Sequence, residues 1–210
     1  MIMNNLKSLI FVFIALIAFS SCSDDDNDIN LLEIASDQVA NLHAPQSGGQ
    51  GQPISGEFTK FNFATGQVTT SETDWDIAFR GTTIIVNGGV SLRTADEPAR
   101  NGNAAAYIAD GTFASVNEIN SALFTQDSGQ GYAIPSGSGN GWYLYNPQLF
   151  LIAPMAGKVL VFRTHDNKFA KVEILSYYKD APANPDVMVD EGRYYTFNYI
   201  YQPNEGINTF

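Results

Sequence analysis

The sequence has little cysteine, histidine or basic charge. Its 210 residues include one cysteine and two histidines, so an internal disulfide is excluded and a zinc site built from Cys and His clusters is not expected. Lys and Arg total 11 against 22 Asp and Glu, which gives a net charge of −11. No Lys/Arg-rich stretch offsets this balance. Nucleic acid is therefore not expected as a partner, because phosphate binding needs clustered cations.

Catalytic motifs are also missing. The sequence contains no Gly-Xaa-Ser-Xaa-Gly elbow, phosphate-binding loop or dinucleotide fingerprint. Asp74 and Asp76 flank Trp75 on a predicted strand, and we interpret them as solvated edge charges rather than an acid and base. His43 and His165 lie far apart in the sequence, and we interpret both as exposed loop residues. The sequence therefore predicts neither an enzyme nor a metal site.

The N-terminus has the pattern of a secretory signal. Lys7 is followed by the continuously apolar segment 9–19, which is too short to span about 30 Å of hydrocarbon as a helix. Two serines then precede Cys22, the single cysteine, as at a lipoprotein signal-peptidase site. We therefore predict a signal peptide over residues 1–21 and lipidation at Cys22. A secreted free thiol or an uncleaved segment is the alternative.

An acidic run follows the cysteine directly. Ser23, Asp24, Asp25 and Asp26 resemble the export signal that carries Bacteroidetes lipoproteins to the outer face of the outer membrane. The plainer interpretation is a solvated, extended linker, and both can hold for a tether over residues 22–35. We expect a surface-exposed outer-membrane protein that contacts the membrane through its lipid anchor only.

The remainder of the chain, residues 36–210, is predicted to be one domain. From Phe58 onward, β-rich segments alternate with turn residues. Segment 74–80 alternates polar and apolar side chains, which predicts a half-buried strand. Segment 113–123 has apolar residues at helical spacing and is the best helical candidate. Further strands are predicted at 82–86, 159–163, 168–178 and 194–201. The predicted fold class is mostly β, antiparallel and multi-stranded, with at most one short helix.

Aromatic residues cluster after a glycine-rich turn. Trp142, Tyr143 and Tyr145 follow Gly141, and Phe150 comes soon after them. Aromatic side chains on loops beside a rigid sheet can line a concave pocket for a flat ligand. The same residues can equally be core packing, and the sequence leaves both interpretations open.

Several of these motifs, in this order, resemble the HmuY family of haem-binding, all-β Bacteroidetes lipoproteins. The resemblance covers about residues 58–203. It rests on the segments Asp74-Trp75-Asp76-Ile77-Ala78-Phe79-Arg80, Asn87-Gly88-Gly89, Gly141-Trp142, Val161-Phe162-Arg163, Lys168 to Ile174 and Thr196 to Tyr201. It implies an all-β protein that captures haem or a related porphyrin outside the cell. Implied partners are a host haem carrier and an outer-membrane receptor.

The haem ligands of the family are not carried over. The resemblance implies two His or Met ligands, one near Asn146-Pro147 and one within 124–132, and neither place holds such a residue. The haem-binding candidates are therefore weaker ligands or apolar contacts. They are Tyr132, Trp142, Tyr143, Tyr145, Phe150 and Met155. The alternative function is a cofactor-free structural or protein-interaction lipoprotein on the same fold, which has lost the His/Met ligands.

Overall fold

The computed structural model describes residues 30–49 and 51–210. The predicted signal peptide, Cys22 and the acidic run Ser23 to Asp26 lie outside these residues, and the boundaries 22–35 and 36–210 stay predictions. No helix in the described part of the chain is long and apolar enough to span a membrane.

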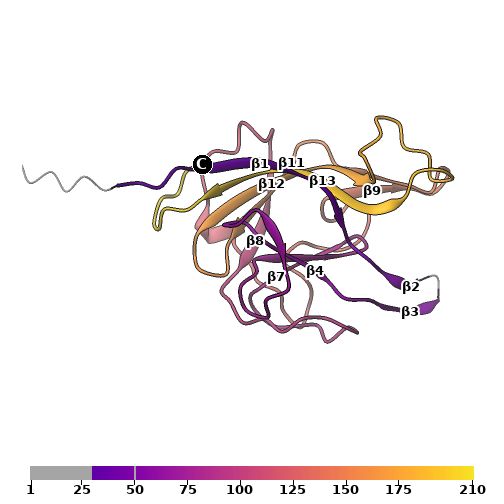
Figure 1. The fold of residues 1–210 in the computed structure, drawn as a ribbon, viewed down its shortest axis with the longest axis horizontal. Helices are drawn as coiled ribbons and strands as arrows, with labels where there is room; N and C mark the ends of the chain where they lie inside the picture. The colour runs from indigo at the N-terminus through magenta and orange to yellow at the C-terminus, as the bar shows by residue number, and fades with distance from the viewer. Residues whose placement is uncertain (1–29, 50) are drawn as a thin grey trace, which may run out of the picture. The chain divides into compact units, whose positions relative to one another are not determined.

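Two antiparallel sheets contain most of the strands in the described chain (Figure 1). The large sheet has the order β1 (Ala35–His43), β13 (Gly192–Gln202), β12 (Phe169–Tyr178), β11 (Lys158–Arg163) and β8 (Ala105–Asp110). The small sheet has the order β5 (Gln67–Thr69), β4 (Thr59–Asn62), β6 (Ile77–Arg80) and β7 (Thr83–Val86). Two hairpins complete the strands, β2 (Ser47–Gly49) with β3 (Gln52–Ser55), and β9 (Tyr143–Asn146) with β10 (Leu151–Pro154). The predicted all-β antiparallel class is confirmed.

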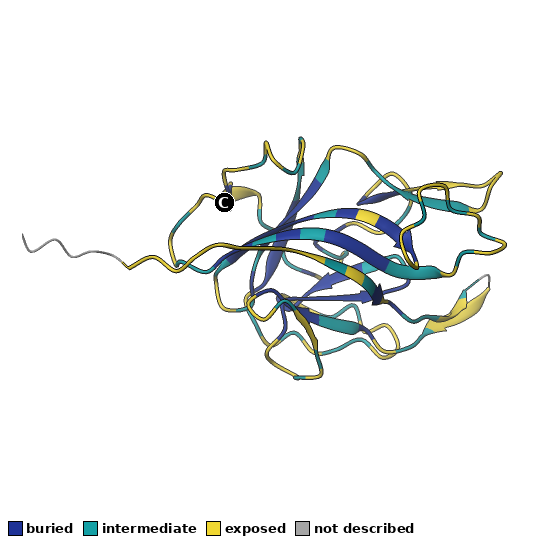
Figure 2. Cartoon of the chain, turned by 45° about the horizontal axis from the view of Figure 1, so that its top comes forward, coloured by how far each residue is buried: buried dark blue, intermediate teal, exposed yellow. Residues whose placement is uncertain are grey.

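The core lies between the two sheets. Along β13, alternate residues Tyr195, Phe197, Tyr199 and Tyr201 point inward and are buried, as the period of two in a strand requires. Phe61 of the small sheet is fully buried and meets Phe197 edge to face, with ring centroids 5.6 Å apart. Figure 2 shows burial concentrated along the central strands, whereas the β2–β3 hairpin is largely exposed.

The strand predicted over 74–80 forms only over 77–80, and its predicted half-burial is wrong. All residues from Trp75 to Arg80 are buried. Ile77 and Phe79 belong to the core between the sheets, while Ala78 on the opposite face packs with Trp75 in a second apolar cluster. The loop that carries Tyr132 packs against this cluster. The small sheet is therefore covered on both faces, which alternation along one strand cannot reveal.

Asp76 is not a solvated edge charge. It is 1% exposed, and its Oδ2 accepts a hydrogen bond from the Phe63 backbone N at 2.7 Å. Its Oδ1 accepts from the His165 backbone N at 2.9 Å and contacts His165 Nδ1 at 2.7 Å. His165 lies in the turn between β11 and β12, so Asp76 links the small sheet to the large one. Asp74 is the exposed partner, 3.3 Å from His165 Nε2.

The helix predicted over 113–123 does not form. The structure has a turn after Phe113 and only a three-residue 3-10 helix, η1 (Ser121–Leu123). The buried ammonium of Lys171 accounts for the difference, because its Nζ donates to the backbone carbonyls of Phe113 and Val116 at 2.8 Å each. Both residues pack against the outer side of β8 and β11. Helical spacing here reflects an apolar loop that is held by a buried cation.

Replacing Asp76 is expected to destabilise the fold strongly. D76A leaves the Phe63 and His165 donors without their acceptor, and each unsatisfied buried donor costs about 1–3 kcal/mol. We expect the free energy of unfolding, measured by urea denaturation, to fall by about 3 kcal/mol. The matched control is D74A, which removes an exposed carboxylate from the same histidine and should cost less than about 1 kcal/mol. Equal losses in the two variants would contradict the inter-sheet role of Asp76.

The stability of the fold is expected to depend on pH through His165. The hydrogen bond to Asp76 raises the pKa of His165 above its usual 6.5, partly opposed by burial and supported by the charges of Asp76, Asp166 and Asp74. A raised folded-state pKa means that the protonated imidazole stabilises the fold below pH 6.5, and that this contribution is lost as pH rises through the folded-state pKa. Urea unfolding between about pH 6 and about pH 9 should therefore show a decline that H165Q reduces. Parallel pH profiles for H165Q and the unmodified chain would refute this.

Candidate ligand-binding hollow

A hollow of about 560 Å³ opens where four separate parts of the chain meet. These are the last residue of β1, the β9–β10 hairpin, the end of β12, and the start of β13 with the loop before it. We call it the aromatic hollow. Its lining residues are His43, Tyr145, Phe150, Ile152, Tyr177, Tyr178, Val187, Asp190, Glu191, Gly192 and Arg193. The mixture of flat rings with a few polar groups suits a flat, largely apolar ligand.

Two of the six sequence-predicted residues lie here. Tyr145 and Phe150 line the hollow and are 41% and 68% exposed. Both come from the β9–β10 hairpin, which is joined to β12 by a hydrogen bond from the Ile152 backbone N to the Tyr178 hydroxyl at 3.0 Å. The hairpin therefore presents its aromatic rings from a defined position.

The other four candidates lie elsewhere. Trp142 and Tyr143 are buried in the core, where the Trp142 Nε1 donates to the Thr82 carbonyl at 3.0 Å. Tyr132 packs against the apolar cluster on the outer face of the small sheet. Met155 lies between β10 and β11, and its backbone N donates to the Trp142 carbonyl at 2.8 Å. The six residues do not form one site.

His43 is the residue that sequence reasoning missed. It ends β1 opposite Tyr194 of β13, and the two rings stack with centroids 4.5 Å apart and planes inclined at 16°. Among the described residues, neither ring nitrogen of His43 makes a hydrogen bond or ion pair, and the side chain is exposed at the hollow. No local pattern signals this role, because it depends on the pairing of strands that are 151 residues apart in the chain.

Arg193 brings a positive charge to the hollow. Its Nη1 donates to the Gln46 carbonyl at 2.6 Å. Within residues 30–49 and 51–210, no carboxylate lies at ion-pair distance from its guanidinium. A guanidinium in this state is suited to binding a ligand carboxylate.

Two backbone positions at the hollow are strained. Arg193 has a φ of +71° and Phe150 a φ of +54°, although neither is glycine. Such conformations cost of order 1 kcal/mol or more and concentrate at binding sites, where the surrounding structure enforces them. Two of the eight non-glycine residues with positive φ in the described chain therefore lie at this hollow.

Burial makes the hydroxyls of Tyr177 and Tyr132 poor metal ligands. Burial raises the pKa of Tyr177 far above its usual 10, and it also raises the pKa of Tyr132. A phenolate ligand at either position is disfavoured, because ionisation would place a negative charge in a partly desolvated site. Iron ligation by Tyr132, one of the sequence candidates, is therefore unfavourable on two grounds, its location and its burial.

The donor set of the aromatic hollow fits a haem group. It contains an imidazole, a guanidinium and exposed aromatic rings, which match an iron, a propionate and a porphyrin face respectively. The ligand positions implied by the family resemblance do not supply this set. Asn146 instead caps the hairpin turn, with its Oδ1 accepting from the Gln148 and Leu149 backbone N atoms at 3.0 and 3.2 Å.

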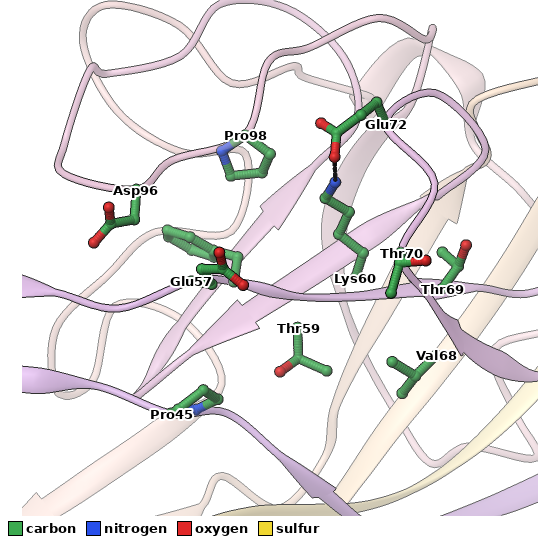
Figure 3. Close-up of a pocket in the computed structure, with 11 residues that line it drawn as sticks. Pro45, Glu57, Thr59, Lys60, Val68, Thr69, Thr70, Glu72, Asp96 and Pro98 are labelled. Atoms are coloured by element: carbon green, nitrogen blue, oxygen red, sulfur yellow. Dashed lines mark hydrogen bonds and ion pairs between the residues drawn. The ribbon is translucent and has the colours of Figure 1, made fainter.

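A second hollow, of about 500 Å³, lies on the small sheet and has a different character. Figure 3 shows Glu57, Lys60, Glu72 and Asp96 around it, with Lys60 Nζ bonded to Glu72 at 2.9 Å. Its aromatic residue, Phe58, is 6% exposed and lies under a buried arginine, Arg80, whose guanidinium carbon is 4.2 Å from the ring centroid. This hollow offers paired charges and no free aromatic face, so it suits a flat apolar ligand poorly.

Comparison with known proteins gives a family match and similar structures. The model of the HmuY protein family matches residues 56–199, and no curated protein sequence matches the chain. An apo HmuY analogue from Tannerella forsythia is 16% identical, with 83% of this chain and 100% of that chain covered and a TM-score of 0.49. A proposed lipoprotein from Bacteroides fragilis is 16% identical, with coverages of 83% and 94% and a TM-score of 0.46. A proposed HmuY-like haem-binding protein from Bacteroides vulgatus is 12% identical, with coverages of 81% and 93% and a TM-score of 0.45.

Proposed function

The chain belongs to the HmuY family, and from this premise we propose that it binds haem or a related porphyrin in the aromatic hollow. The single observation that carries the proposal is the meeting of exposed Tyr145 and Phe150 with His43 and Arg193 in one hollow. A solved structure similar to this chain is described as a proposed HmuY-like haem-binding protein, which agrees in ligand class.

Different residues of the hollow would contact different parts of a porphyrin. Tyr145 and Phe150 would contact its apolar face, and Arg193 would pair with a propionate. Bound haem would supply an iron that can accept a donor atom from the protein. The negative charge of Glu191, next to Arg193, is partly offset. Lys179 Nζ lies 3.6 Å from its carboxylate, and the Tyr194 hydroxyl donates to it at 3.3 Å.

We also propose the cellular setting that the N-terminal sequence predicts. Cleavage after residue 21 and lipidation at Cys22 would anchor the domain to the outer membrane, and the acidic run after it would direct the domain to the cell surface. There the protein would act as a binding protein rather than an enzyme in haem or iron acquisition. Its partners would be a host haem carrier and an outer-membrane receptor.

A second candidate function is supported by the apolar surface around the hollow. Leu149 and Phe150 on the hairpin, and Met188 and Val189 on the loop before β13, are each at least 60% exposed. Exposed apolar groups of this kind mark protein-interaction surfaces. Their presence favours the cofactor-free alternative, in which the hairpin and loop contact a protein directly.

Haemin titration of the chain from Ser23 onward tests the leading proposal. We expect a saturable shift of the Soret band. The double variant Y145A/F150A should weaken binding by about tenfold or more, because each aromatic contact contributes about 0.5–1.5 kcal/mol. The control is V90A, which truncates a similarly exposed apolar residue outside the hollow and should leave the titration unchanged.

Two outcomes would contradict the proposal. One is a featureless titration with both ferric and ferrous haem, which would favour the cofactor-free alternative. The other is equal binding by Y145A/F150A and V90A, which would place the porphyrin away from the aromatic hollow.

A further inference from the structure

We propose that His43, the last residue of β1, is the axial ligand to the iron of haem bound in the aromatic hollow. This inference rests on the proposed function and adds the donor atom that the family ligand positions lack. It comes from this chain's own geometry, because His43 precedes the residues 56–199 that the family model matches.

Comparison of the possible strong donors singles out His43. The described residues contain two histidines and two methionines, namely His43, His165, Met155 and Met188. His165 has carboxylates at both ring nitrogens, Asp76 at 2.7 Å and Asp74 at 3.3 Å. Neither methionine lines the hollow, and Met188 is 88% exposed. His43 alone among the four lines the hollow, and both of its ring nitrogens are free of hydrogen bonds and ion pairs with residues 30–49 and 51–210.

The structure also holds the His43 ring in place. Histidines that bind metals usually have their ring orientation fixed by a hydrogen bond from the second ring nitrogen. Among the described residues His43 makes no such bond, and its ring is held instead by Tyr194, which stacks on one face of the imidazole and leaves its edge, where the nitrogens lie, uncovered by that contact. Tyr194 is itself fixed, because its hydroxyl donates to Glu191 and the Lys179 ammonium lies 5.5 Å from its ring centroid. Tyr194 is thus a positioning residue for the proposed ligand.

The proposed ligand, His43, lies on a strand, β1, that is paired with β13. His43 and Tyr194 are register partners in the β1–β13 ladder, and the next residue, Ala44, donates its backbone N to the Arg193 carbonyl at 2.8 Å. The backbone that carries His43 is therefore joined to the backbone of Arg193, the proposed propionate partner. One short stretch of paired chain positions both polar contacts with the porphyrin.

The variant H43F tests the assignment, since it keeps an aromatic ring to stack on Tyr194 and removes the nitrogens. The chain from Ser23 onward would be titrated with haemin and, separately, with iron-free protoporphyrin. If His43 ligates the iron, H43F should lower the affinity for haemin relative to protoporphyrin by about tenfold or more. The Soret band and the ferric electron paramagnetic resonance spectrum should change, and added imidazole should restore the original spectra.

The control is H165Q, which removes the other histidine and should leave the haemin spectra unchanged once near-ultraviolet circular dichroism shows that it is folded. Unchanged haemin spectra in H43F would overturn the ligand assignment and leave the proposed porphyrin binding intact. Absence of haemin and protoporphyrin binding by the unmodified chain would overturn both. Y194L removes the stacking partner of His43 but no donor atom, and it should alter the haem spectra. Unchanged spectra in Y194L would contradict the positioning role of Tyr194.

Discussion

The packing of the two sheets depends on one buried carboxylate. Asp76 directly precedes β6 and accepts hydrogen bonds from the chain following β4 and from the turn between β11 and β12. A buried carboxylate is tolerated only when its oxygens are well bonded, so the two sheets must come together in one arrangement to satisfy it. The aromatic core then supplies area and cohesion, but it has no comparable directional requirement. Asp76 thus sets the relation between the sheets.

Neighbouring polar residues extend this constraint to the loops. The Asn87 side chain donates to the Thr73 and Trp75 carbonyls and accepts from Asn101 and Gly102, so it ties segment 90–104 to β6. A side chain at Gly88 could not fit, because its Cβ would lie 1.9 Å from the Ala104 carbonyl oxygen.

Asp127 makes a similar connection on the outer face of the small sheet. Its carboxylate accepts hydrogen bonds from the backbone N of Val86, the backbone N of Ala133 and the Arg100 guanidinium. These bonds lower the pKa of the carboxyl, but burial outweighs them and raises it. The motifs that carry the family resemblance at 74–80 and 87–89 belong to this framework. These family motifs therefore lie outside the lining of the aromatic hollow.

Features that depend on local sequence were predictable, whereas features that depend on contacts between distant residues were not. Strands such as β11, β12 and β13 were predictable, because alternation and β-branched or aromatic content report local burial directly. The burial of Asp76 and the loss of the helix over 113–123 were not, since each depends on a partner distant in the sequence, His165 and Lys171 respectively. Of the aromatic candidates, Tyr145 and Phe150 reach the hollow whereas Trp142 and Tyr143 pack in the core. Aromatic content alone cannot distinguish these two environments.

The separation of framework and hollow also explains how a site can change while the fold is kept. The residues that line the aromatic hollow make none of the hydrogen bonds of Asp76, Asn87 or Asp127, so exposed members such as Tyr145 and Phe150 can change without loss of these bonds. The family resemblance implies an iron ligand on the β9–β10 hairpin. A ligand on β1 instead would be carried by a paired strand rather than by a loop. Because the ladder with β13 already fixes the backbone of His43, and Tyr194 restricts its ring, less conformational entropy remains to be lost on binding. A single preorganised imidazole can in this way offset part of what a pair of loop ligands would contribute.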